Sequence, residues 1–246
     1  MLLNISILLF SALLGGFLAF KFRSVEKLSF AMVLAFAGSY LLVITLVHIL
    51  PELYISSSNI GITGLYVVGG FFLQLLLENL TAGAEHGHVH PLDQHHDHKA
   101  GLGISLLIGM SVHALLEGSL LTQNETMASL DNLAIALGIG LHKLPAAFAM
   151  LTILLCYYKD KTRPMLYLLL FSLASPIGLV LSQYAIDINL FNHQVSDIIF
   201  GLVSGSFLYI STTIVFESAP GHSVKSAKLL ALMLGAAVAL LVEMSL

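Results

Sequence analysis

The chain has 246 residues, of which 57% are hydrophobic and 10% are charged, and its formal net charge is −4. Soluble domains carry about a quarter of charged residues, so this composition excludes an ordinary soluble domain. The charge balance shows no basic excess and therefore gives no indication of a nucleic-acid partner. The composition indicates a polytopic membrane protein in contact with the lipid bilayer, with residues 1–246 forming a single transmembrane domain.

Eight apolar segments follow one another along the chain, and most approach the roughly 20 residues that cross a hydrocarbon core. They lack the alternation of barrel strands and are too long for them, so each is predicted to be a helix. The fold class is therefore an all-α membrane protein with eight transmembrane helices. Pro51 is expected to end the second of them. The segments are residues 2–20, 29–50, 62–80, 102–122, 132–157, 165–185, 195–216 and 226–245.

The basic residues fall in alternate connections between the segments. Nine of the ten Lys and Arg side chains lie on one predicted side of the membrane, and the tenth, Lys143, lies inside the fifth segment. Cytoplasmic loops carry an excess of Lys and Arg, so this side is predicted to be cytoplasmic. Both termini are then expected on the extracytoplasmic side. The nine residues are Lys21, Arg23, Lys27, Lys99, Lys159, Lys161, Arg163, Lys225 and Lys228.

The connection between the third and fourth segments, residues 81–100, is rich in histidine and predicted to be cytoplasmic. Imidazole and carboxylate groups suit zinc and similar divalent metals. We expect weak metal binding by this loop; a solvated linker is the alternative interpretation. The loop contains six of the eleven histidines, together with Asp93 and Asp97, and these six are His86, His88, His90, His95, His96 and His98.

Four ionisable residues lie inside apolar segments, where each costs roughly 2.5–3.5 kcal/mol to insert. His113 and Glu117 are four residues apart in the fourth segment and share one helix face. His142 lies at a similar depth in the fifth segment. Two imidazoles and a carboxylate are three ligands of a divalent-metal site, and a fourth position stays open for exchange. The alternative is that Glu117 pairs with Lys143 and ties the two helices together without a metal.

Four further residues are candidates for smaller roles. His48 and Glu52 lie at the outer end of the second segment, where they either attract cations at an entrance or form an interfacial cap beside Pro51. Ser172 lies close to Pro176, which removes a backbone hydrogen bond inside the sixth segment. It is a possible auxiliary oxygen ligand, as is the neighbouring Ser175.

Several short motifs, in order and on corresponding helices, resemble those of the Zrt-/Irt-like (ZIP) divalent-metal transporters. The resemblance covers nearly the whole chain. It implies a 3+2+3 arrangement in which the first and last three helices are inverted repeats, and we also expect a homodimer. The motifs are HILPE (His48–Glu52), HALLEG (His113–Gly118), HKLPAAFAM (His142–Met150) and SGSFLYIS (Ser204–Ser211).

The chain also departs from the pattern of this family. Many relatives hold two metals side by side, using an Asn, an acid and a Glu at positions occupied here by Ala114, Lys143 and Ala146. Lys143 is therefore interpreted as a substitute for the second metal, which predicts one transported ion. An acid expected in the seventh helix is replaced by Ile214, and Glu217 lies a turn later.

These observations predict a secondary transporter that moves a divalent transition metal into the cytoplasm by alternating access, rather than an enzyme. Zinc is the first expected substrate, and Fe²⁺, Mn²⁺, Cd²⁺ and Co²⁺ accept the same ligands. The alternative function is an intramembrane zinc-dependent hydrolase, which also buries histidines and a carboxylate. The sequence contains no H-E-x-x-H motif.

Overall fold

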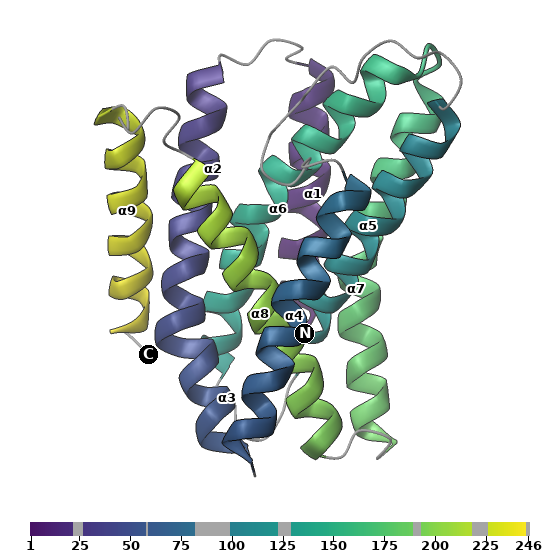
Figure 1. Cartoon of the computed structure of the whole chain (residues 1–246). Helices are drawn as coiled ribbons and strands as arrows, with labels where there is room; N and C mark the ends of the chain where they lie inside the picture. The colour runs from purple at the N-terminus through teal and green to yellow at the C-terminus, as the bar shows by residue number, and fades with distance from the viewer. Residues whose placement is uncertain are drawn as a thin grey trace.

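The computed structural model describes residues 1–21, 27–57, 59–81, 99–122, 129–188, 193–217 and 226–244. These residues form a helical bundle without strands (Figure 1). The helices are α1 (Leu2–Lys21), α2 (Lys27–Ile44), the π-helix η1 (Thr45–Ile49), α3 (Leu50–Ser56), α4 (Ile60–Thr81), α5 (Lys99–Ser119), α6 (Ser129–Tyr157), α7 (Thr162–Asp187), α8 (His193–Glu217) and α9 (Ser226–Glu243).

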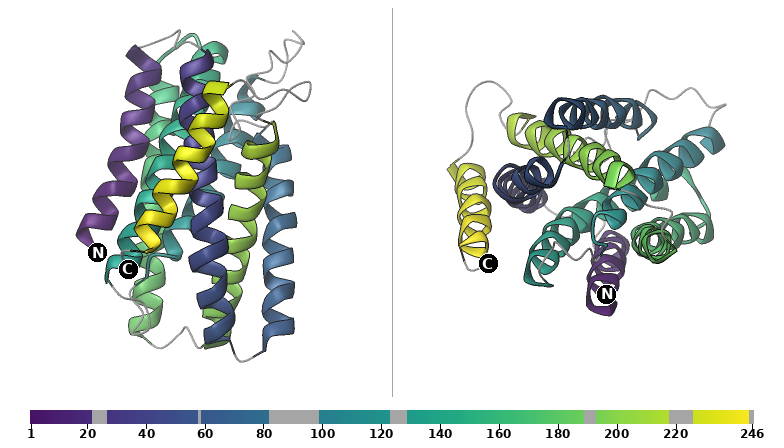
Figure 2. Two further views of the ribbon diagram at one scale, coloured as in Figure 1. Left: turned by 90° about the vertical axis from the view of Figure 1, so that its left-hand side faces the viewer. Right: turned by 90° about the horizontal axis from the view of Figure 1, so that it is seen from below.

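The helices confirm the predicted all-α membrane class. Among the described residues, seven helical stretches are long and apolar enough to cross a membrane, and α2, η1 and α3 together make one of them. The eighth, in α5, is shorter in its described apolar part, Gly103–Ser119. Both termini lie toward the same end of the bundle (Figure 2), and the helix ends nearest the basic residues lie at the opposite end.

The prediction that Pro51 ends the second helix is wrong. The helix continues to Ser56, because the π-helix η1 precedes the proline and Pro51 falls in the first turn of α3. The Leu50 N–H donates to the Thr45 carbonyl, five residues back. A proline in a first turn has no intrahelical donor to lose, so the wider turn lets the chain pass the proline without stopping.

The helices pack mainly within two groups, visible end-on in Figure 2: α1, α5, α6 and α7 form one, and α2, α4, α8 and α9 form the other. In the second group, the contact of α4 with α8 corresponds to that of α9 with α2. In the first group, the contact of α1 with α6 corresponds to that of α7 with α5. Exchanging the first three spans with the last three, which run in opposite directions, and exchanging α5 with α6 maps each pair onto its counterpart. This pairing is the one that inverted repeats produce.

Glycines allow the closest helix contacts in both groups. Between α4 and α8, a Cβ on Gly70 would overlap the backbone carbonyl of Leu202, and a Cβ on Gly205 would overlap that of Val67. Between α5 and α7, a Cβ on Gly118 would overlap the Ser175 carbonyl. Small residues let backbones approach closely inside a membrane, where apolar side chains gain little by leaving lipid.

Gly70→Ala is expected to destabilise the bundle, by about 1–3 kcal/mol for an overpacked contact. The measurement is the thermal midpoint in detergent. Gly69→Ala is the matched control, since its Cβ would meet only the Leu202 side chain at an ordinary 3.6 Å. Equal midpoints for the two variants would contradict a close backbone contact between α4 and α8.

Candidate metal centre

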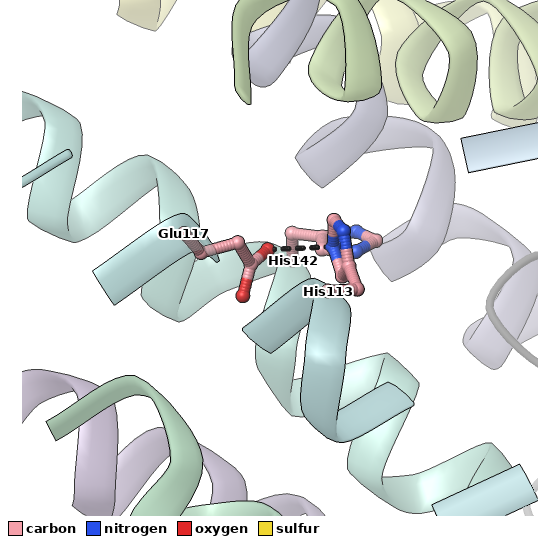
Figure 3. A group of neighbouring side chains, drawn as sticks. All are labelled: His113, Glu117 and His142. Atoms are coloured by element: carbon pink, nitrogen blue, oxygen red, sulfur yellow. Dashed lines mark ion pairs between the residues drawn. The ribbon is translucent and has the colours of Figure 1, made fainter. Parts of the chain in front are cut away.

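Two neighbouring helices bring three candidate ligands together. His113 and Glu117 lie one turn apart on α5, and His142 projects toward them from α6 (Figure 3). One nitrogen from each imidazole and one carboxylate oxygen all lie within 4.8 Å of one another. The three side chains are buried. Among the described residues, this is the one group of three or more His, Cys, Asp or Glu side chains at metal-binding distance.

The donor set suits a zinc-like ion in chemistry and size. Tetrahedral zinc lies about 2.1 Å from nitrogen and oxygen ligands, which places those ligands about 3.4 Å apart. His113 Nε2 and Glu117 Oε1 are 2.9 Å apart, and the His113 and His142 rings are nearly perpendicular at a centroid distance of 6.1 Å. A modest contraction from the 4.8 Å limit therefore gives a three-ligand site.

The Glu117 carboxylate has a partner on each oxygen. Oε1 lies 2.9 Å from His113 Nε2, and Oε2 lies 3.1 Å from Lys143 Nζ. The sequence suggested metal binding and ion pairing as alternative roles for Glu117. The structure makes them compatible, because one oxygen faces the imidazole while the other faces the ammonium.

Lys143 is 1% exposed and is held by three kinds of partner. Besides Glu117, its ammonium donates to Ser175 Oγ at 2.5 Å and lies 4.7 Å from the centre of the Phe171 ring. Ser175 Oγ in turn donates to the Ala114 carbonyl at 2.5 Å. A buried ammonium is costly unless it is paired and hydrogen-bonded, and this set of contacts meets that requirement.

Ser175, rather than Ser172, contacts this group of side chains. Ser172 is fully buried, and its hydroxyl donates to the Leu169 carbonyl of its own helix at 2.8 Å. The suggestion that Ser172 serves as an auxiliary ligand remains a prediction, and the observed contact of α7 with the site goes through Ser175 and Lys143.

Two polar residues at the site were missed by the sequence analysis. His113 Nδ1 lies 3.1 Å from Ser206 Oγ of α8, and that hydroxyl donates to Gln74 Oε1 of α4 at 2.7 Å. Gln74 is a polar residue in an otherwise apolar stretch of α4, and Ser206 lies in the SGSFLYIS motif. Those were the available signals, but nothing in the sequence joins positions so far apart.

The remaining candidates lie outside the group. His48 Nδ1 is 3.2 Å from Glu243 Oε2, so the pair joins η1 to α9. Glu52 is partly exposed in the first turn of α3. Neither His48 nor Glu52 belongs to the three-ligand group, and their role at an entrance stays a prediction. The loop histidines His86, His88, His90, His95, His96 and His98 lie outside the described residues.

Known proteins resemble this chain over much of its length. The zinc transporter ZIP9 of Xenopus tropicalis is 28% identical over 170 residues, which cover 66% of this chain and 55% of that protein. The zinc transporter ZIP9 of Micropogonias undulatus is 26% identical over 164 residues, covering 64% and 52%. Protein zntD of Dictyostelium discoideum is 28% identical over 120 residues, covering 48% and 17%.

The chain spans about half the length of the ZIP9 relatives that it matches. Residues 83–243, well over half of the chain, match the family described as ZIP Zinc transporter. The matched range contains His113, Glu117, His142 and Lys143. The chain therefore belongs to the ZIP zinc transporter family.

Proposed function

We propose that this chain carries divalent transition metal ions, zinc first, across a membrane into the cytoplasm. The observation that carries the proposal is the buried group of two imidazoles and one carboxylate on adjoining helices, with ligand atoms within 4.8 Å. Membership of a zinc transporter family and the names of the ZIP9 relatives support the same substrate. Nitrogen and oxygen ligands also accept Fe²⁺, Mn²⁺, Cd²⁺ and Co²⁺.

His113, Glu117 and His142 replace three waters of the incoming ion, and a fourth position stays open for exchange of ligands. All three ligands belong to the group formed by α1, α5, α6 and α7. Movement of this group against the other would therefore present the intact ligand set to each side in turn. The inverted-repeat pairing of the helices supports such alternating access.

Lys143 is proposed to take the place of a second metal. Its ammonium lies 3.1 Å from Glu117 Oε2, where a second cation sharing this carboxylate would bind. The contacts with Ser175 and the Phe171 ring hold it there. The site is then mononuclear, because a second divalent ion would meet a fixed positive charge.

The charges of the chain set the proposed orientation of the bundle, and with it the cytoplasmic end toward which the ion is proposed to move. Helix ends near the basic residues gather at one end, which the charge rule places in the cytoplasm, with both termini outside. A homodimer remains part of the proposal.

An intramembrane hydrolase is not favoured, since family membership supports a transporter. Of the two Glu117 oxygens, Oε2 is paired with Lys143 and Oε1 faces the candidate ligand His113.

Glu117→Gln is expected to lower zinc uptake into proteoliposomes by at least about 100-fold, since second-shell losses alone cost 10–100-fold in metal affinity. Asp187→Asn is the control, because this exposed carboxylate at the end of α7 contacts Gln183 and lies outside the group. The double variant Glu117→Gln with Lys143→Met removes the unpaired buried charge, and it should fold without transporting. Native uptake by either Glu117 variant would contradict the site, and peptide or lipid hydrolysis by the native chain would favour an enzyme.

Lys143→Ala is expected to raise bound zinc from one ion per chain to two, because it removes the ammonium beside Glu117 Oε2. Zinc-to-protein ratios of the purified protein measure this change. Both chains should carry a deletion of residues 85–98, so that loop histidines do not add to the count. Two ions in the chain with Lys143, or one in the Lys143→Ala variant, would argue against the lysine as a substitute for a metal.

Deletion of residues 85–98 is expected to leave zinc uptake in place while changing how uptake responds to zinc on the cytoplasmic side. The reason is that weak, exchangeable histidine ligands can sense or collect a released ion without forming the transport site. Initial uptake rates at several internal zinc concentrations test this role. Complete loss of uptake would instead assign the loop to transport itself.

A further inference from the structure

A chain of hydrogen bonds reaches His113 from the opposite helix group. It runs from Gln74 on α4 to Ser206 on α8 and then to the imidazole on α5. Gln74 is 0% exposed and Ser206 is 3% exposed. Buried polar side chains in a membrane protein are costly unless they form hydrogen bonds. Ser206 bonds with both Gln74 and the candidate metal ligand His113.

The direction of these hydrogen bonds follows from the number of protons. A serine hydroxyl has one hydrogen to donate, and Ser206 donates it to Gln74 Oε1 at 2.7 Å. With the Gln74 amide oxygen turned toward Ser206, the 3.1 Å contact between Ser206 Oγ and His113 Nδ1 runs the other way, and Nδ1–H donates to the Ser206 oxygen. In a neutral ring the lone pair is therefore on Nε2, the nitrogen that faces Glu117 Oε1.

The other tautomer, with its hydrogen on Nε2, would prevent His113 from binding a metal through that nitrogen. A hydrogen on Nε2 would lie on the side of Glu117 Oε1, which is only 2.9 Å from that nitrogen. The nitrogen would then have no lone pair for a metal, and its hydrogen would stand between two members of the three-ligand group. A His and a Glu one helical turn apart are close enough to compete with a metal for each other, so an external partner for the second ring nitrogen favours metal binding.

We propose that Gln74 and Ser206 are positioning residues that fix the His113 tautomer and keep Nε2 available for the metal. The proposal rests on the proposed function, because it assigns a role toward the ion carried at that site. Partners that receive the second N–H of a ligating histidine orient the ring, and their loss typically costs 10–100-fold in metal affinity. The same reduction is expected here, with little change in folding.

The test compares Ser206→Ala with Ser206→Thr and Ser211→Ala. Ser211 is the matched control, since it is a fully buried serine of the same helix whose hydroxyl donates to the Phe207 carbonyl of that helix. Zinc affinity of the purified protein in detergent is expected to fall about 10–100-fold in Ser206→Ala. It should stay near native in Ser206→Thr and Ser211→Ala. Gln74→Leu should weaken zinc binding in the same direction.

Nitrogen NMR of histidine-labelled, metal-free protein gives a readout that does not depend on transport. His113 is assigned by difference from His113→Gln. The native ring should carry its hydrogen on Nδ1, and Ser206→Ala should move it to Nε2. A general loss of packing would not produce this specific exchange.

The two proposals fail in different ways. If the native chain carries zinc but Ser206→Ala matches Ser211→Ala in both affinity and tautomer, the positioning role is overturned and transport stands. If the native chain neither binds nor carries zinc, the proposed function is overturned, together with the metal role of Ser206. Weakened affinity with a changed tautomer in Ser206→Ala, restored in Ser206→Thr, supports the positioning role.

Discussion

The Glu117 carboxylate, buried between an imidazole on one oxygen and an ammonium on the other, is the constraint around which the centre of this bundle is built. Charge in a low-dielectric interior must be compensated locally. That requirement draws Lys143 in from α6 and Ser175 from α7, while Phe171 supplies an aromatic face. Gly118, next to Glu117, lets α7 come close enough for these contacts. Helix packing and the chemistry of the site therefore depend on the same carboxylate.

The site also marks the boundary between the two helix groups. The candidate ligands and Lys143 belong to one group, whereas Ser206 and Gln74 belong to the other. The hydrogen bond from His113 to Ser206 crosses between them. The preferred tautomer of His113 is thereby tied to the relative position of the groups, which links the geometry of the bundle to the ligand set without any contact between Ser206 and an ion.

Hydropathy and spacing predicted much of this arrangement. Long apolar segments require helices in a bilayer, and the four-residue interval from His113 to Glu117 places both on one face. The prediction that Pro51 ends the second helix was wrong because a π-helical turn leaves no periodic pattern in the sequence. The proline was therefore the one signal that the sequence offered at this point. Gln74 and Ser206 were missed for a different reason. Isolated polar residues in apolar helices have many uses, and their contact joins positions 132 residues apart.

The pairing of Glu117 with Lys143 has an electrical consequence. The two charges cancel, so a divalent ion added to the site brings two positive charges that the pair does not neutralise. Any part of the membrane voltage that the loaded site crosses then acts on those charges, at roughly 2.3 kcal/mol per charge for each 100 mV. If the chain carries the ion as proposed, a voltage negative inside would favour inward movement of the loaded site. The same voltage would exert no net force on the neutral Glu117–Lys143 pair. In the proposed transport cycle, the lysine would therefore make the loaded half electrogenic.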